Sequence, residues 1–355
     1  MGSDDRQHDR SVSVAIVGAT GYAGGELLRI LAAHPQVEIA GVVGRGRQRE
    51  PIGQSQPHLA DTGQVVDAAM PKADCVFLAL PHGEAAAIVP GLLEKGTAVI
   101  DLGPDFRLRR AADYPTWYGF EHPCPPLLDR SIYGLPELHR SELVAAARGS
   151  EAALVGSPGC YPTASLLAIA PLARAGLIAD LVVDAKSGVS GAGREARREY
   201  LYAEVNENVR AYGLGGHRHS AEIEQELEWL GATDALAAGV TFLPHLVPMT
   251  RGILSTAHVR PARPIDQAEL DSLYRDFYAG EPFVRVVDEP PETKHVLGSN
   301  ACRVHVRLQE RTGRIVALAV IDNLVKGAAG QAVQSFNLVH SLSETAGLGQ
   351  LPLAP

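Results

Sequence analysis

The order of apolar and polar positions divides the chain into two parts with different strand patterns. In the first part, short apolar runs rich in β-branched residues occur at 12–17, 37–44, 74–80, 97–103 and 152–156. They are typical of buried parallel strands. A helical pattern opens after Gly21 and stops at His34-Pro35, and a second one covers 84–96 despite Pro90. Strands that alternate with helices predict a parallel, doubly wound sheet with right-handed crossovers.

The pattern changes after residue 104. A segment rich in proline and aromatic residues follows and predicts a long irregular excursion from the sheet. Longer strands, in which apolar and polar residues partly alternate, are predicted at 181–187, 239–248, 253–261, 302–310 and 314–322. Such strands predict a largely antiparallel sheet. A helix with one apolar face is expected over 326–343. The fold class is therefore α/β, with a Rossmann-type parallel-sheet domain and an α+β domain with a largely antiparallel sheet.

Composition narrows the classes of function. The chain has 355 residues, which indicates about two domains. Its net charge is −9, so it lacks the excess of basic residues that is typical of a nucleic-acid binder. It contains no apolar run of membrane-spanning length, and residues 1–11 read as a polar, mobile tail without a secretory signal. The four cysteines are far apart and form no CxxC pair, so we expect no structural metal site and a reduced, cytoplasmic environment.

A glycine turn between the first strand and helix points to a dinucleotide. Gly18, Gly21 and Gly24 have the spacing that lets a backbone turn tightly and approach a pyrophosphate at a helix N-terminus, although such a turn can also be purely structural. The second strand is followed by Arg45 and Arg47, where an NAD site usually has an acid. Guanidinium groups suit a 2′-phosphate and favour NADP; the alternative is a solvated basic loop.

The strongest chemical signal is GSPGCYPTASLLAIAPLA at 156–173. Cys160 follows a Pro-Gly turn and precedes an apolar helix whose first N–H groups and dipole would stabilise a thiolate and hold an oxyanion. Pro162 fits the first helical turn. The alternative is a buried structural cysteine, the commonest fate of free cysteine. A thiolate together with NADP favours the interconversion of an aldehyde and an acyl derivative through a thioester.

Such chemistry needs an acid/base and, for an acyl phosphate, a cation. His217 and His219 flank Arg218 in a glycine-rich loop that opens a helix, which Ser220 is expected to cap; a solvated polar loop is the alternative. Arg107 follows the 97–103 strand, where ligands gather in open α/β sheets, unless it forms a surface salt bridge. His82 follows another strand, and its alternative role is to cap the next helix.

Several motifs occur in an order that resembles a known family. GATGYAGGELLR, LALPHG, DFRL, YGLPEL, PGCYPTA, SGVSGAGR, GHRH-x-x-EI and IDNLVKGAAGQAVQ occur in that order between residues 18 and 334, and the resemblance runs over essentially the whole chain except residues 1–11. They are similar to the N-acetyl-gamma-glutamyl-phosphate reductases of arginine biosynthesis, a group related to aspartate-semialdehyde dehydrogenase. The resemblance implies NADPH-dependent reduction of N-acetyl-glutamyl 5-phosphate to its semialdehyde with release of phosphate, through a thioester on Cys160.

The resemblance also implies roles for residues and segments. His217, slightly preferred over His219, would be the acid/base. Residues expected to bind substrate are Arg107, Ser157, Tyr161 and Glu222. Residues expected to bind the cofactor are Gly18, Thr20, Gly21, Tyr22, Ala23, Gly24, Arg45, Arg47, Pro81, His82, Ser187, Gly188, Gly191 and Asn323. The last helix would fold back, giving a dinucleotide domain of 12–157 and 326–355 and a catalytic domain of 158–325. Homodimers or homotetramers are implied.

A related reductase of the lysine pathway, which acts on an aminoadipyl phosphate carried on a small acidic protein, is the alternative. The stretch YGFEHPCPPLLDRSIYGLPEL is similar to that branch, but the branch tends to show GCNATA where this chain has Tyr161-Pro162. Ser157 departs from the Asn or Val that often precedes PGC in the arginine family. A Rossmann dehydrogenase without a covalent intermediate and a cofactor-binding regulator are the other two classes. The acyl chain length, five or six carbons, is left open.

Overall fold

The structure, a computed structural model, describes residues 11–44, 49–232 and 239–353. The chain forms two compact units, each built from separate segments. The first unit comprises 1–109, 122–157 and 332–349, and the second comprises 110–121, 158–331 and 350–355. Of the predicted tail 1–11, only Ser11 lies within the described residues, and the predicted Arg45 and Arg47 lie outside them.

The first unit is organised around an eight-stranded sheet. Its strands, in spatial order, are β3 (Glu50–Pro51), β4 (Val65–Asp67), β2 (Val37–Val43), β1 (Val12–Val17), β5 (Cys75–Leu78), β6 (Ala98–Asp101), β8 (Leu154–Gly156) and β7 (Ser131–Tyr133). Every pairing is parallel except β3 with β4. The central strands β5 and β6 are buried throughout, as expected for apolar strands covered on both faces. The prediction of a parallel Rossmann-type sheet is confirmed.

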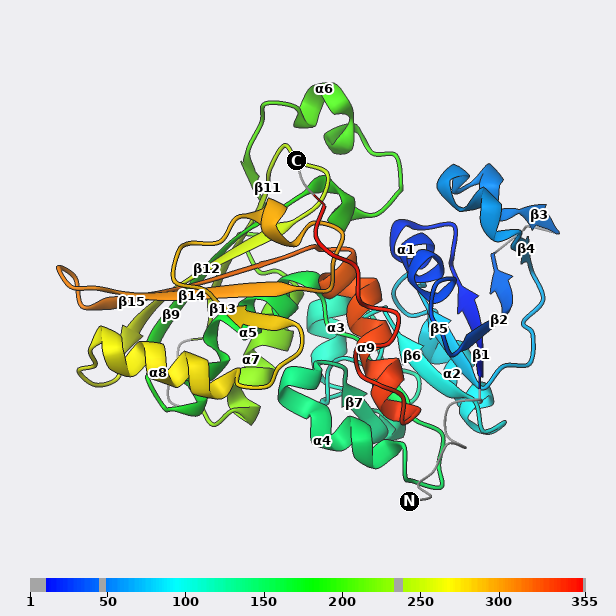
Figure 1. The fold of residues 1–355 in the computed structure, drawn as a ribbon, viewed down its shortest axis with the longest axis horizontal. Coiled ribbons are helices and arrows are strands. Elements are labelled where there is room, and N and C mark those ends of the chain that lie inside the picture. The colour runs from blue at the N-terminus through cyan, green and yellow to red at the C-terminus, as the bar shows by residue number, and fades with distance from the viewer. Residues whose placement is uncertain (1–10, 45–48, 233–238, 354–355) are drawn as a thin grey trace, which may run out of the picture. The chain divides into compact units, whose positions relative to one another are not determined.

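Helices bury apolar faces in this unit. α1 (Tyr22–Leu31) buries Leu27, Leu28 and Ile30, and α2 (Ala85–Leu93) covers most of the predicted helix 84–96. α4 (Pro136–Ala146) was not predicted, because its amphipathic pattern is weak. α9 (Gly330–Val339) contributes Phe336, whose ring lies 5.4 Å from the ring of Phe77 on β5. Figure 1 shows α1 in blue, α2 in cyan, α4 in blue-green and α9 in red.

The second unit contains a seven-stranded sheet. Its strands, in spatial order, are β10 (Arg210–Ala211), β11 (Thr241–Leu246), β9 (Ile178–Ser187), β12 (Ile253–Pro261), β15 (Arg314–Ile321), β14 (Cys302–Gln309) and β13 (Val284–Val286). The pairings are antiparallel except β9 with β11 and β13 with β14. The predicted, largely antiparallel sheet is confirmed, with both parallel pairs outside its β9–β12–β15–β14 centre.

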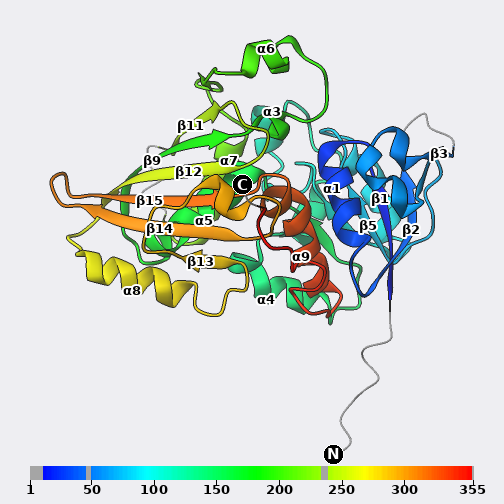
Figure 2. The same cartoon turned by 45° about the horizontal axis from the view of Figure 1, so that its top comes forward.

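One face of the second sheet is covered by helices. α5 (Cys160–Arg174) is buried over nearly its whole length and packs on β12 and β15, while α8 (Gln267–Phe277) packs on β14. α7 (His219–Trp229) lies against α5. Figure 2 shows α5 and α8 on the same side of the strands. Along β12, residues alternate between buried and half-buried, so the opposite face of the sheet carries the half-buried set.

Shorter elements complete the described chain. The predicted excursion after residue 104 contains α3 (Asp113–Tyr118) and a 3₁₀ turn at Pro125–Arg130, and further 3₁₀ turns occupy Ile52–Gln54, Pro57–Thr62, Val189–Ala192, Arg198–Tyr200 and Thr293–Val296. α6 (Tyr202–Val205) is a single turn in the second unit. The predicted helix 326–343 is corrected at both ends, because Val325–Ala329 is a π-helical turn that leads into α9, and α9 ends at Val339.

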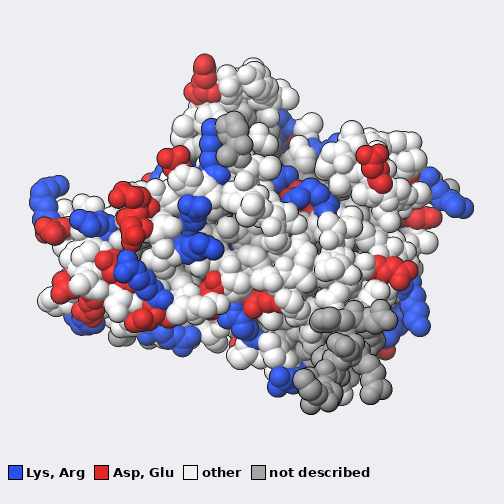
Figure 3. All heavy atoms as spheres, in the orientation of Figure 1, with Lys and Arg blue, Asp and Glu red and all other residues white. Residues whose placement is uncertain are grey.

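The surface gives two further observations. On the face drawn in Figure 3, positive and negative side chains are intermingled, and no extended field of one sign is visible. Among the helices of the described residues, none combines the length and the hydropathy of a bilayer-spanning segment.

Candidate active site

The glycine turn after β1 has the geometry of a dinucleotide cradle. Gly18 has a φ of +87°, and a Cβ there would collide with the carbonyl oxygen of Ala79. A Cβ on Gly24 would collide with the backbone of Gly18, so this glycine allows the helix to pack closely. A Cβ on Gly21 would meet only the Gly18 oxygen at 3.5 Å, which leaves its outer side open. These are the three glycine roles that pyrophosphate binding requires.

A side chain that sequence reasoning missed holds this turn. The Nε2 atom of Gln56 donates to the carbonyl oxygens of Ala19, Thr20 and Gly21 at 3.3, 3.2 and 2.9 Å. Gln56 is 5% exposed. Because these carbonyls point at the glutamine, the backbone N–H groups at the start of α1 remain directed away from it. Nothing in the sequence signals this role, since Gln56 lies far from the turn along the chain.

The carboxyl ends of β5 and β6 carry other predicted residues. Pro81 and His82 are exposed in the loop after β5. The N-cap position of α2 is Glu84 rather than His82, and the carboxylate of Asp105 accepts the Ala86 N–H at the start of this helix. Tyr22 and Ala23 begin α1 immediately after the glycine turn.

Arg107 is buried rather than paired on the surface. Its Nε donates to the carbonyl oxygen of Ser157 and its Nη2 to that of Leu102, both at 2.7 Å. Ser157 in turn donates its N–H to the carbonyl oxygen of Asp101, at 2.8 Å. The loops after β6 and β8 are therefore tied together at the edge where ligands bind in open α/β sheets. The surface salt bridge considered for Arg107 is wrong.

Cys160 is the first residue of α5 in the second unit. The N-cap residue Gly159 offers no side-chain cap, and Pro162 has no N–H. The N–H groups of Cys160 and Tyr161 therefore lie at the mouth of a 15-residue helix, where the helix dipole favours negative charge. Cys160 is half-buried, whereas Cys75 and Cys302 are buried. Burial raises the pKa of the Cys75 thiol, which marks Cys75 as a structural cysteine.

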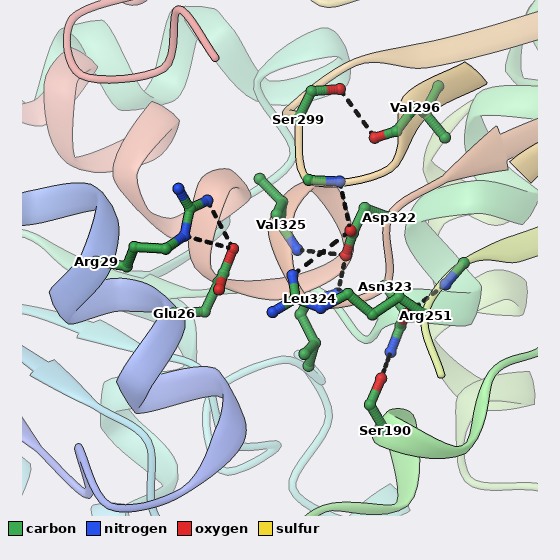
Figure 4. A network of polar contacts seen from close by, with 12 residues as sticks. Glu26, Arg29, Ser190, Arg251, Val296, Ser299, Asp322, Asn323, Leu324 and Val325 are labelled. Carbon is green, nitrogen blue, oxygen red and sulfur yellow. Dashed lines mark hydrogen bonds and ion pairs between the residues drawn. The ribbon is translucent and has the colours of Figure 1, made fainter. Parts of the chain in front are cut away.

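The π-helical turn before α9 packs directly against the cysteine. A Cβ on Gly327 would lie 2.8 Å from the Cys160 Cβ, so only glycine fits here without a shift. The turn is held by Asp322, whose Oδ1 accepts the N–H groups of Leu324 and Val325, as Figure 4 shows. The N–H of Gly327 bonds to the Asp322 carbonyl five residues back. Sequence reasoning missed this contact.

The HRH segment brings two histidines and a carboxylate to Gly159. Glu222 is fully buried, and its Oε2 accepts the Gly159 N–H at 2.9 Å. His219 Nε2 lies 3.9 Å from Glu222 Oε1 and 2.5 Å from the position that a Cβ on Gly159 would take. Tyr118 donates its hydroxyl to Glu222 Oε1 at 3.5 Å. The predicted Ser220 cap is wrong: α7 begins at His219 and Ser220 lies inside its first turn.

His217 has a different environment. Its Nδ1 accepts the N–H of His219 at 3.2 Å, and the two imidazole rings are 4.7 Å apart. Burial, with a smaller contribution from Arg218, lowers the pKa of His217 to about 4. His217 is therefore neutral near pH 7, and because Nδ1 is an acceptor, its proton resides on Nε2.

A cavity of about 430 Å³ opens beside Cys160. The predicted residues that line it are Cys160, Tyr161, Ser187, Gly188, Gly191, His217 and His219. Ala192 and Arg218, which belong to the predicted SGVSGAG and HRH segments, also line it. The residues there that the sequence did not single out are Arg197, Glu199, Tyr200, Arg210, Tyr212 and Leu246. Tyr212 donates to the Tyr161 hydroxyl at 3.0 Å, and Tyr161 donates to the His245 carbonyl at 3.1 Å.

The segment 187–193 and Asn323 are linked by hydrogen bonds. Asn323 is 1% exposed; its Oδ1 accepts the Gly252 N–H at 2.7 Å and its Nδ2 donates to Ser190 at 2.9 Å, as drawn in Figure 4. A Cβ on Gly188 would lie 2.7 Å from the Thr250 carbonyl oxygen, so glycine permits this close approach. The Asn323 amide therefore fixes the loop that forms the Ser187–Gly191 side of the cavity.

Comparisons with known proteins agree with this architecture. Residues 13–146 match the model of the semialdehyde dehydrogenase NAD-binding domain, and residues 160–323 match that of the semialdehyde dehydrogenase dimerisation domain. Among solved structures, aspartate semialdehyde dehydrogenase II of Vibrio cholerae, complexed with ASA, has a TM-score of 0.69 at 19% identity, covering 93% of this chain and 98% of that one. The NADP-bound Candida albicans enzyme has a TM-score of 0.68 at 16% identity, with the same coverage. These likenesses show the fold.

Curated relatives are much more similar in sequence. The N-acetyl-gamma-glutamyl-phosphate reductase of Heliobacterium modesticaldum is 48% identical over 97% of this chain and 100% of its own length. The enzymes of the same name from Dehalococcoides mccartyi and Citrifermentans bemidjiense are 46% and 47% identical, over 98% and 97% of this chain and all of theirs. These names do not favour the lysine-pathway alternative. The chain is thus an oxidoreductase of the semialdehyde dehydrogenase type, and it belongs to the N-acetyl-gamma-glutamyl-phosphate reductase family.

Proposed function

We propose that the chain reduces N-acetyl-glutamyl 5-phosphate to N-acetyl-glutamate 5-semialdehyde, using NADPH and releasing phosphate, in arginine biosynthesis. The observation that carries this proposal is the position of Cys160. It is the first residue of a buried helix, it lines a cavity, and it shares that cavity with two histidines and several arginines. The identity of the substrate is inferred from the names of the relatives.

The chain's own residues account for the acyl transfer. The Cys160 thiolate attacks the acyl phosphate carbon, and the charge that develops on the carbonyl oxygen faces the N–H groups at the mouth of α5. When the tetrahedral centre collapses, the bond to the phosphate oxygen breaks, phosphate leaves and a thioester on Cys160 is left. When bound, NADPH supplies the hydride that reduces the acyl group to the aldehyde level. Release of the aldehyde then breaks the carbon–sulfur bond and returns the electron pair to Cys160.

His219 is the better candidate for the acid/base, which reverses the slight preference for His217 that the resemblance implied. Its Nε2 lies against Gly159, next to the nucleophile, and the buried Glu222 carboxylate is 3.9 Å away to balance an imidazolium. His217 is held neutral by its lowered pKa and presents an Nε2 proton as a donor. His219→Asn should lower kcat by about 100-fold or more. His217→Asn, the matched variant, should retain more activity.

NADP is the proposed cofactor. Within the first unit, Gly18, Gly21 and Gly24 leave an open backbone surface at the start of α1, which fits a pyrophosphate. Arg45 and Arg47 follow β2, and the residues after this strand contact the adenosine ribose in dinucleotide-binding folds. Charge reversal at these arginines should weaken NADPH far more than NADH. Equal losses for the two cofactors would contradict the assignment of the arginines.

A homodimer through the second unit is also proposed. The face of the sheet that α5 leaves uncovered carries half-buried apolar residues at alternating positions, including Val182, Leu254 and Leu318. The matching family model is described as a dimerisation domain. Leu254→Asp combined with Leu318→Asp should shift the sedimenting species to the monomer mass. An unchanged mass would place the interface elsewhere.

The activity itself is tested in the reverse direction. Wild-type protein is incubated with NADP, inorganic phosphate and N-acetyl-glutamate 5-semialdehyde, and reduced nicotinamide is followed by absorbance. Cys160→Ala should abolish turnover while NADPH binding persists. Turnover of the six-carbon homologue in preference to the five-carbon one, or activity retained by Cys160→Ala, would refute the proposal.

A further inference from the structure

We propose that Arg210 binds the non-reacting α-carboxylate of the substrate and thereby restricts the enzyme to acyl phosphates that carry a free carboxylate. This inference rests on the proposed function and assigns the second anionic group of its substrate. N-acetyl-glutamyl 5-phosphate carries a phosphate on the reacting carbon and a carboxylate at the other end. A cavity that binds it therefore needs a second cation besides the groups around Cys160.

The local structure directs Arg210 toward the cavity. β10 pairs antiparallel with β11, so that Arg210 is opposite Leu246 and Ala211 is opposite His245. Side chains two residues apart on a strand lie on the same face, and both Arg210 and Tyr212 line the cavity with Cys160. Tyr212 is tied to its place, because its N–H bonds to the Pro244 carbonyl and its hydroxyl donates to Tyr161.

The charge balance of the cavity wall selects Arg210 among its arginines. Arg197 is engaged by Glu195, with an Nη2–Oε2 distance of 2.7 Å. The hydrogen bond to Glu195 raises the pKa of Arg197, and Glu199 adds to the effect. Within the described chain, no carboxylate lies within ion-pair distance of Arg210. A guanidinium that lines a cavity and has no carboxylate within ion-pair distance is suited to bidentate binding of a ligand carboxylate.

The spacing fits the length of the substrate. Tyr212 touches Tyr161, the residue after the nucleophile, and Arg210 is two residues away in the segment that begins with β10, about 7 Å for extended backbone. Four covalent bonds separate the reacting carbon of the substrate from its α-carboxylate carbon, a span of about 5 Å. The remaining arginine, Arg218, lies between the two histidines. It is the better placed cation for the phosphate on the reacting carbon.

The test compares two substrates in each of several variants. In the reverse assay, N-acetyl-glutamate 5-semialdehyde and its α-methyl ester are titrated against wild type, Arg210→Met and Arg210→Lys, and the KM of inorganic phosphate is measured in parallel. Wild type should prefer the acid by about 10- to 100-fold in kcat/KM, expressed mainly in KM. Arg210→Met should lose this preference while it keeps the rate on the ester and the KM of phosphate, and Arg210→Lys should retain part of it.

Controls separate the possible outcomes. Arg198→Met, whose side chain is 88% exposed and absent from the cavity wall, should behave as wild type. The rate on the ester reports folding within each variant, because a misfolded protein loses both substrates together. The inference is overturned if Arg210→Met keeps the preference, if Arg197→Met loses it instead, or if only the KM of phosphate rises. If wild type turns over neither semialdehyde, the proposed function fails and this inference fails with it.

Discussion

Asp101 provides a quantitative test of the electrostatics of the first unit. It ends β6 with no exposed surface, one carboxylate oxygen accepts the Gly103 N–H at 2.8 Å, and Oδ2 has no hydrogen-bond partner among the described residues. Burial, and to a lesser extent the neighbouring carboxylate of Asp105, raises the pKa of Asp101 from 3.8 to about 7. The Asp101 carboxyl therefore keeps its proton in the folded protein up to nearly neutral pH, where the same carboxyl would be fully ionised in the unfolded chain.

The sign of the effect follows from proton linkage. Between pH 4 and pH 7 the folded state holds a proton on Asp101 that the unfolded state has lost, so this group makes folding less favourable as the pH rises. The stability contributed by the protonated carboxyl is fully present below pH 4 and is lost as the pH rises through about 7. The total change is about 4 kcal/mol, at about 1.4 kcal/mol for each pH unit within the window.

Asp101→Asn removes the titration while preserving an acceptor for Gly103. Its stability relative to wild type should rise with pH by about 4 kcal/mol between pH 4 and pH 7, and the difference should be constant above pH 8. Both tryptophans, Trp117 and Trp229, belong to the second unit, so fluorescence is a poor probe of this sheet. Hydrogen exchange of the β5 and β6 amides, corrected for intrinsic rates at each pH, measures the opening free energy directly.

A matched variant controls for charge removal in general. Asp61→Asn changes an exposed carboxyl of the same unit and should follow the wild-type pH dependence. If the Asp101→Asn and wild-type opening free energies run parallel from pH 4 to pH 8, Asp101 is ionised in the folded protein. The buried, half-partnered carboxyl would then need a counter-charge, for which Arg107 is the available cation.

Three further predictions concern the two glycine-rich sites. Iodoacetamide should label Cys160 faster than Cys75, Cys124 and Cys302 at neutral pH, as mass spectrometry of the peptides can show; equal rates for all four would refute an activated thiol. Gly327→Ala should lower kcat and slow this labelling by 10-fold or more without changing NADPH affinity, because its Cβ would press on Cys160. Unchanged labelling would mean that the π-helical turn can shift. Gln56→Ala should cost about 1–3 kcal/mol in calorimetry and weaken NADPH binding, since it removes the side-chain donor that three carbonyls of the glycine turn share; an effect on stability alone would separate Gln56 from cofactor binding.

The parts of the fold that the sequence predicted are those with a strong local signal. Apolar β-branched runs located β1, β5 and β12, and the turn at Gly18 marked the start of α1 because glycine alone tolerates a φ of +87°. α4 escaped prediction because its polar and apolar residues are poorly separated around the helix. The start of the last helix was misjudged because a π-helical turn and an α-helical one share the same apolar pattern over five residues.

The candidate site divides in the same way. Cys160 and the HRH segment were identified because residue type, glycine neighbours and a following helix coincide within a few positions. Arg210 and Tyr212 were not, because β10 is two residues long, ends just before Tyr212 and has no periodicity to detect. The Ser220 cap failed because α7 begins one residue earlier than the local sequence indicates, so that His219 itself is the first helical residue.

Cys160 is positioned by backbone packing more than by side-chain hydrogen bonds. Gly159 packs against His219, and Gly327 packs against the Cys160 Cβ. Neither glycine has a positive φ, so each is required because a side chain would not fit there. A thiol confined in this way keeps one geometry as its charge changes, which suits a nucleophile that must attack, carry and release an acyl group. It follows that alanine at either glycine should damage the transfer steps more than substrate binding, whereas substitutions at Arg210 should damage binding more than transfer.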